Sequence, residues 1–228
     1  MQWCYSMVEM GEAQKESQGF SIVILGAMNP RIHHPLWYRH HGLITESEMM
    51  ESLSTNSQPV FLPQIAQFKS AGMQFSCVTE RWDVRVTDEG LRGRMAEIAA
   101  TIFDKLLPET PVQVFGFNNE FHLTAGRREV KRKLVERVVK RGFDLSFPGL
   151  DGAMFAFTIS AVDDATTTVR AEPSDHSPDE IFVAVNANRP VKATTSHFAL
   201  KPLFDQHYDN DFEAAKGYAQ SLLHALRD

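Results

Sequence analysis

The order of the apolar segments constrains the fold of this 228-residue chain more than any other feature. Segments with the alternating or β-branched pattern of strands come in groups, and longer segments with helical periodicity separate the groups. The expected strands are residues 20–27, 73–78, 82–87, 112–124, 154–162, 166–171 and 181–188. Because a helix does not follow every strand, the order predicts an α+β fold, with a largely antiparallel sheet and amphipathic helices packed mainly on one face.

Capping residues and apolar stripes at steps of three and four mark the helical segments. Thr45 and Glu48 fit a capping box, and Asn210 and Glu213 make a similar pair before the last apolar stripe. The expected helices are residues 45–53, 91–106, 127–141 and 210–226.

The chain is expected to fold as a single unit. Residues 1–18 are polar and lack a clear period, so we expect a loosely structured lead-in, followed by one α+β domain over residues 19–228. No internal repeat is visible in the sequence, and residues 173–180 (PSDHSPDE) are expected to form an exposed loop.

The composition is that of an ordinary globular protein, with 43% hydrophobic and 23% charged residues. Two cysteines, Cys4 and Cys77, cannot make a disulfide framework, and neither a signal peptide nor a membrane-spanning apolar run is present. These features predict a cytoplasmic protein without a membrane partner. Phosphate-binding, dinucleotide-binding, zinc-protease, serine-hydrolase and CxxC motifs are all missing, so no cofactor is expected and a protein that is not an enzyme is favoured.

Residues 127–141 hold eight of the 23 lysines and arginines and carry a net charge of +6, whereas the whole chain carries −6. On a helical wheel, apolar side chains fall on one side and basic side chains on the other. The outward basic side chains are Arg132, Lys133, Arg137 and Lys140. Glu129 and Glu136 are placed to pair with two of them. A solvated face, a contact surface for an acidic protein and a phosphate-binding surface all fit this pattern.

Residues 31–41 (RIHHPLWYRHH) combine aromatic and basic side chains, which dominate the energetics of protein interfaces. The expected anchors for a partner are Arg31, Trp37, Tyr38 and Arg39. Imidazoles also bind zinc or nickel. The four metal-ligand candidates are His33, His34, His40 and His41, although two adjacent pairs separated by Pro35 lack the usual ligand spacing. A structural role for these side chains at the end of the first strand is the third interpretation.

In the expected strand 112–124, alternation places Glu120 and His122 on one face and Phe121 on the other. A carboxylate near an imidazole suits acid–base chemistry, and satisfied polar residues on a sheet face explain the pair equally well. The enzymatic alternative is a metal-dependent hydrolase that combines the four histidines of residues 31–41 with Glu120 and His122.

Three consecutive segments carry a resemblance: a strand hairpin, an amphipathic helix, and a strand rich in aromatics and asparagine. They are residues 73–86 (MQFSCVTERWDVRV), 91–112 (LRGRMAEIAATIFDKLLPETPV) and 113–121 (QVFGFNNEF). Their order resembles a sporadically distributed family of uncharacterised bacterial proteins. The family's G-x-R-Y-x-N strand motif has its counterpart in residues 116–119, which lack the arginine and the tyrosine. The resemblance implies an α+β fold and a mobile or defence-associated context, and it supplies no catalytic residues.

Together these features predict a non-enzymatic protein that binds another protein with an acidic surface. The predicted role is an accessory, sensor or inhibitory subunit of a bacterial defence- or toxin-associated assembly. The alternatives are the metal-dependent hydrolase and a nucleic-acid-binding module that uses residues 127–141.

Overall fold

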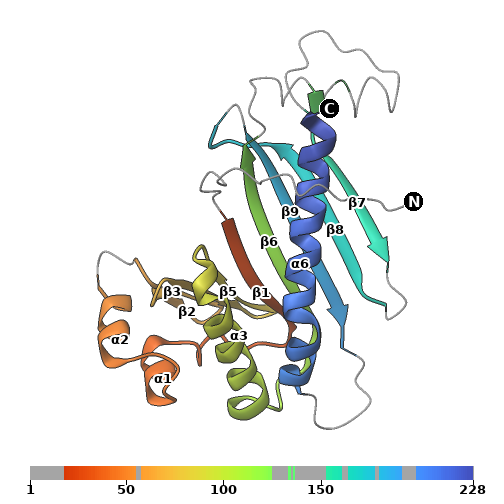
Figure 1. Cartoon of the computed structure of the whole chain (residues 1–228). Coiled ribbons are helices and arrows are strands. Elements are labelled where there is room, and N and C mark those ends of the chain that lie inside the picture. The colour runs from red at the N-terminus through yellow and green to blue at the C-terminus, as the bar shows by residue number, and fades with distance from the viewer. Residues whose placement is uncertain are drawn as a thin grey trace, which may run out of the picture.

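The computed structural model describes residues 18–54, 58–124, 133–134, 136, 153–160, 164–177, 180–191 and 199–227. Nine strands in these ranges form one sheet in the order β2-β3-β4-β5-β1-β6-β9-β8-β7 (Figure 1), and every neighbouring pair is antiparallel. The strands are β1 (Gln18–Gly26), β2 (Val60–Leu62), β3 (Ile65–Ser70), β4 (Met73–Val78), β5 (Arg81–Val86), β6 (Val112–Thr124), β7 (Phe155–Ser160), β8 (Thr166–Pro173) and β9 (Glu180–Pro190). The predicted α+β class with an antiparallel sheet is therefore confirmed.

The helical elements of the described ranges are α1 (Pro35–His40), α2 (Glu46–Ser52), η2 (Glu89–Leu91), α3 (Arg92–Thr101), the π-helical turn η3 (Ile102–Leu106) and α6 (Leu200–Arg227). The predicted capping box opens α2: the Thr45 hydroxyl accepts from the Glu48 N–H at 3.3 Å, and the Glu48 carboxylate accepts from the Thr45 N–H at 2.7 Å. No helix in the part of the chain that the structure describes has both the length and the apolar composition needed to cross a membrane.

The start predicted for the last helix, at Asn210, is wrong. Helix α6 begins ten residues earlier because Asp104 of η3 caps it from a distant part of the chain. The Asp104 carboxylate accepts hydrogen bonds from the backbone N–H groups of Leu200 at 2.6 Å and Lys201 at 2.8 Å. These donors are among those that the first turn of a helix leaves unpaired.

Strand register aligns one apolar row across five strands. Phe68 of β3 lies opposite Phe75 of β4, which is followed by Val84 of β5, Ile22 of β1 and Phe117 of β6. All five side chains are buried. Helices at both ends of the row contact it: Tyr38 of α1 lies 5.0 Å from Phe75 between ring centroids, and Phe204 of α6 lies 5.2 Å from Phe117.

The order of elements is repeated along the chain, although the sequence shows no repeat. In the N-terminal half, β1 is followed by an insertion (α1, α2 and β2), three consecutive strands (β3–β5) and a helix (α3). In the C-terminal half, β6 is followed by residues 125–154, three consecutive strands (β7–β9) and a helix (α6). The two halves meet in the middle of the sheet, where β1 pairs with β6 (Figure 1).

Candidate functional site beside helix α1

The first half of the predicted contact segment forms a turn, and the second half forms the short helix α1. His34 caps the helix, because its Nδ1 atom accepts a hydrogen bond from the Leu36 N–H at 3.1 Å. Pro35 occupies the first helical position, where the missing N–H is not needed. Gly42, with φ of +71°, then takes the left-handed conformation that ends many helices.

A buried chain of hydrogen bonds attaches α1 to the sheet. The Trp82 indole Nε1–H of β5 donates to the Tyr38 hydroxyl oxygen at 3.0 Å. The same oxygen lies 3.0 Å from His33 Nδ1. Since the indole can only donate, the phenol proton is left to point at His33 Nδ1, which accepts it. Burial lowers the pKa of His33 to about 4 and raises the pKa of Tyr38, so both side chains are neutral near pH 7.

Tyr38 is therefore a core residue, and its predicted role as an exposed anchor for a partner is wrong. The side chain is fully buried and lies 5.0 Å from Phe75 and 5.1 Å from Phe68 between ring centroids. The amphipathic turn of α1 directs this ring into the sheet and leaves its neighbours Leu36 and Trp37 on the outer side.

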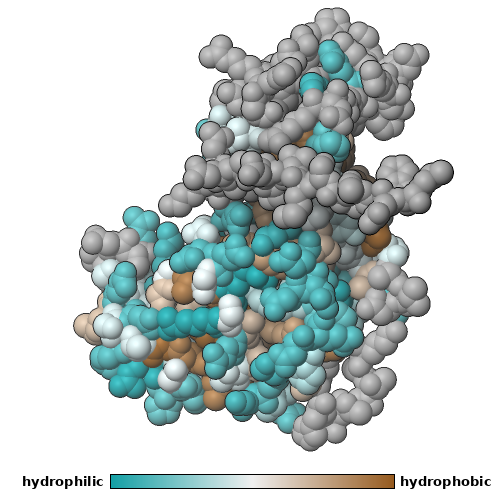
Figure 2. Space-filling view, viewed as in Figure 1, coloured by the Kyte–Doolittle hydropathy of each residue, from teal (hydrophilic) through white to brown (hydrophobic). Residues whose placement is uncertain are grey.

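The outer side of α1 borders a groove of about 650 Å³. Its described lining residues are Arg31, Ile32, His34, Leu36, Trp37, His40 and Leu107. Leu36 is 60% exposed and lies beside the half-buried Trp37, so the two form a continuous apolar surface at the groove. Hydrophobic residues near α1 are visible as brown patches among the hydrophilic ones in Figure 2.

A smaller hollow of about 210 Å³ continues the apolar surface toward β2. His34 and Arg31 line both spaces, and Phe61 and Leu62 of β2 line only the smaller one. The His34 imidazole lies against the Phe61 ring, with 4.3 Å between centroids. Partial burial lowers the pKa of His34, so this imidazole is neutral at pH 7 and joins the two hollows as an uncharged surface.

The charge at the groove has one sign. None of the lining residues that the structure describes is acidic, whereas Arg31 contributes a permanent positive charge. Arg39, another predicted anchor, does not line the groove: its Nε donates to Glu46 of α2 at 2.8 Å, and both side chains are exposed. Of the four predicted anchors, Arg31 and Trp37 thus line the groove, whereas Tyr38 and Arg39 do not.

The four predicted metal-ligand candidates of residues 31–41 do not converge. His33 is bonded to Tyr38 inside the protein, and His34 caps α1. His41 packs edge-on against Trp37 with 4.7 Å between ring centroids, and His40 lies 4.9 Å from His41. Within the ranges given above, the one group of three potential ligands lies elsewhere, at His122, Asp175 and His176. The structural interpretation of the imidazoles therefore fits His33 and His34.

Most of the predicted basic face lies outside the described residues, namely Arg132, Arg137 and Lys140. Lys133 is described and half-buried, and Leu134, on the predicted apolar side, is completely buried in the core. The contact surface and the nucleic-acid interface that use this face stay predictions.

The predicted face shared by Glu120 and His122 is present on β6, because Phe121 is buried on the other side. However, Glu120 does not pair with His122. Its carboxylate accepts a hydrogen bond from Arg85 of β5 at 2.5 Å, across the intervening strand β1. Gly19 of β1 makes room for this ion pair, since an added Cβ would lie 3.0 Å from the Glu120 carboxylate.

His122 instead lies beside two residues that the sequence analysis missed, Asp175 and His176, within the segment predicted to be an exposed loop. Burial and the neighbouring His176 hold the pKa of His122 below its ordinary value, against the opposing effect of nearby carboxylates. The one sequence signal that could have identified this group is the Asp175-His176 pair, shortly after the expected strand 166–171.

No protein-family model matches this chain, and no curated protein matches it significantly.

Proposed function

We propose that this chain is a non-enzymatic protein that binds another protein through the groove beside α1. Its role would be that of an accessory, sensor or inhibitory subunit in a bacterial defence- or toxin-associated assembly, in the cytoplasm. The observation that supports binding is the groove itself, in which the exposed Leu36 and the half-buried Trp37 border a hollow of about 650 Å³. The kind of assembly rests on the resemblance of residues 73–121 alone.

The chemistry of the groove favours a particular partner. Leu36, Trp37 and Leu107 offer an apolar surface that a leucine, methionine or aromatic side chain would fill. Arg31 beside this surface favours a carboxylate next to that apolar residue, because Arg forms strong paired hydrogen bonds with carboxylates. The expected partner is therefore a protein with an acidic surface around an apolar anchor.

The groove is preformed, which lowers the free-energy cost of binding. The buried bonds from Trp82 to Tyr38 and from Tyr38 to His33 hold α1 in place without a partner. We also propose that the helices lie mainly on one face of the sheet. The contacts of Tyr38 with Phe75 and of Phe204 with Phe117, both in one row across the sheet, support this arrangement.

Affinity capture with the purified full chain tests the proposal through a matched pair of variants. Leu36→Arg places a charge in the groove, and Met50→Arg makes the same change at an equally exposed residue of α2, 61% against 60%. We expect an acidic protein to be retained by the wild type and by Met50→Arg, with Leu36→Arg weakening its dissociation constant at least about tenfold, or about 1.4 kcal/mol.

Thermal unfolding of both variants controls for misfolding, and Trp37→Ala provides a second test in the same groove. The proposal is overturned by a partner that binds Leu36→Arg and Trp37→Ala as tightly as the wild type. It is equally overturned by the absence of any partner that distinguishes the wild type from Leu36→Arg.

A further inference from the structure

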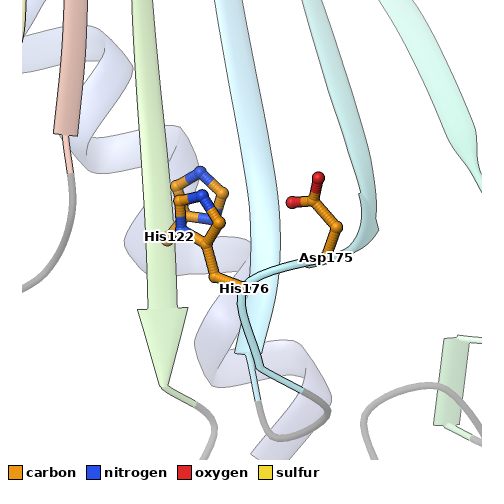
Figure 3. Close-up of side chains that lie close together, drawn as sticks. All are labelled: His122, Asp175 and His176. Carbon is orange, nitrogen blue, oxygen red and sulfur yellow. The ribbon is translucent and has the colours of Figure 1, made fainter.

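Three side chains that bind metal ions in proteins meet at the end of β6 (Figure 3). His122 lies near the end of this strand, and Asp175 and His176 lie in the connection between β8 and β9. One ligand atom from each lies within 4.8 Å of the other two. Zinc bonds of about 2.0–2.1 Å place tetrahedral ligands roughly 3.4 Å apart, so the three ligand atoms would have to draw closer together. Asp175 and His176 are exposed and lie in the connection, so these two residues can supply that movement.

Ser174 fixes the orientation of the His122 ring. The Ser174 hydroxyl donates its single proton toward Glu180 at 3.4 Å, and its oxygen accepts from the His176 backbone N–H at 3.1 Å. His122 Nδ1 lies 2.8 Å from the same oxygen, and in the tautomer that carries its proton on Nδ1 this atom donates to Ser174. The proton on Nδ1 leaves the lone pair on Nε2, which is the atom available to a metal ion.

This arrangement has the form of a metal ligand held by an outer hydrogen bond. In metal sites, an imidazole that binds through one nitrogen commonly donates its other N–H to an oxygen acceptor, which orients the ring and raises its basicity. Ser174 is almost completely buried, so the acceptor is rigidly placed. Its own link to Glu180 connects the His122 ring to a carboxylate.

The two imidazoles already lie together. Their rings are stacked with 3.8 Å between centroids and 12° between planes, as Figure 3 shows. The lone pair of an imidazole nitrogen lies in the plane of its ring, so two parallel rings cannot both point at one ion. The exposed His176 ring must therefore turn out of the stack to share an ion with His122. The Asp175 carboxylate beside the two imidazoles completes a set of one oxygen and two nitrogen ligands.

We propose that His122, Asp175 and His176 bind one divalent transition-metal ion, with zinc the ion that best fits two imidazoles and a carboxylate. Three protein ligands leave one coordination position for water or another ligand, unlike the closed four-ligand sites that only stabilise a fold. The ion would also tie the β8–β9 connection to β6.

The proposed metal site is separate from the groove beside α1. Figure 1 shows that β6 ends on the side of the molecule away from α1, and Figure 3 shows His122 near that end of β6. The metal site and the protein-binding groove are therefore independent, and either proposal can fail without the other.

Titration of the chelator-treated full chain, made without a histidine tag, with zinc alone tests the proposal by calorimetry. We expect one equivalent to bind with a dissociation constant of about 1 μM or tighter. Cobalt in place of zinc is expected to give the visible absorption of a four-coordinate site. His176→Ala and His122→Ala should each abolish this binding, and Ser174→Ala should weaken it about 10–100-fold without changing the stoichiometry.

The double variant His40→Ala/His41→Ala is the matched control, because it removes two adjacent exposed imidazoles at the C-terminal end of α1. Its zinc affinity should equal that of the wild type. His176 is exposed, so His176→Ala tests the proposal even where His122→Ala fails to fold. Absence of binding at about 100 μM zinc, or binding that survives His176→Ala or is lost in the α1 control, overturns the metal site.

Discussion

The two halves of the sheet share an order of elements and differ in the connections between them. The turn between β4 and β5 is only residues 79–80, whereas the corresponding connection between β8 and β9 is residues 174–179 and carries Ser174, Asp175 and His176. Conversely, the groove lies in the insertion that follows β1, in the N-terminal half. Most residues of both candidate sites thus lie in connections between strands, which vary more than the strands themselves and where binding residues concentrate in folded proteins.

The helix that follows the three strands also differs between the halves. The longer one, α6, packs on both halves and connects them. Helix α3 has 10 residues, whereas α6 has 28 and contacts strands of both halves. Phe204 of α6 packs on Phe117 of β6, and Phe212 packs on Phe20 of β1 with 5.5 Å between ring centroids. The Arg92 guanidinium of α3 lies 3.5 Å from the centre of the Phe212 ring. The repeated order therefore does not imply two independently stable halves.

The largest expected effect comes from a substitution that creates a cavity in the C-terminal half, where α6 covers β6. Phe117→Ala should lower the free energy of unfolding by about 3–5 kcal/mol, because the ring is buried against Phe204 and Tyr208. Denaturant unfolding followed by tryptophan fluorescence and by far-UV circular dichroism measures it. The two tryptophans within the described ranges, Trp37 and Trp82, belong to the N-terminal half, so their fluorescence reports on that half.

One cooperative unit requires both signals to shift to the same lower midpoint. A fluorescence midpoint that stays at the wild-type value while the circular dichroism midpoint falls would show that the halves unfold separately. Thr158→Ala, on the exposed edge strand β7, is the control and should change the stability by no more than about 0.5 kcal/mol.

The sequence was sufficient where local pattern determines structure. The alternation in β4, β5 and β6 and the stripe of α3 predicted those elements, because strand and helix periods are properties of neighbouring residues. Strands β2 and β3 were missed because β2 has only three residues and Pro63 follows it directly, which hides the alternation of the pair. The start of α6 was missed because its cap, Asp104, is 96 positions before Leu200.

For the groove, the composition of residues 31–41 identified the segment, but it did not predict which of its side chains face the sheet. Aromatic and basic residues marked residues 31–41, and Arg31 and Trp37 do line the groove. Which ring faces the sheet depends on Trp82, 44 positions after Tyr38, and no local pattern contains that bond. The group at His122 depends on the sheet order β6-β9-β8, which places the connection after β8 beside β6.

An acid-sensitive bond in the N-terminal half gives the next largest expected effect. Burial lowers the pKa of His33 to about 4, so between pH 6.5 and 4 the unfolded chain binds a proton that the folded chain does not. Stability is therefore full above pH 6.5 and falls as the pH drops, by about 3 kcal/mol from this group alone at pH 4. Protonation would turn Nδ1 into a donor and break the bond from Tyr38.

His33→Asn removes the titration and keeps a polar side chain, so urea unfolding at pH 7, 6, 5 and 4 should show a shallower loss for the variant than for the wild type. Among the histidines within the described ranges, His33 alone is fully enclosed, which makes the expected effect specific to the α1 side of the molecule. Equal pH slopes in the two proteins would mean that His33 does not hold α1 in the manner described.

The smallest expected effect concerns the ion pair that links α2 to α3 in the same half. Hydrogen bonds from Arg94, at 2.9 Å to each carboxylate oxygen, lower the pKa of Glu48 to about 2. A lowered carboxyl pKa stabilises the fold above about pH 4.5, and this contribution is lost as the pH falls toward 2. Since both side chains are partly exposed, solvent screening limits the contribution to about 1 kcal/mol or less.

Glu48→Gln removes the charge and keeps the helix cap, because glutamine can still accept the hydrogen bond from the Thr45 N–H. At pH 7 the variant should be about 0.5–1 kcal/mol less stable than the wild type. The gap measured by urea unfolding should close between about pH 4.5 and 2 as the wild-type carboxylate becomes neutral. A gap that stays constant over this range would assign the loss to altered cap geometry. The charge of Glu48 would then contribute little to the contact between α2 and α3. Of the two contacts, only the His33–Tyr38 hydrogen bond would make the stability depend on pH.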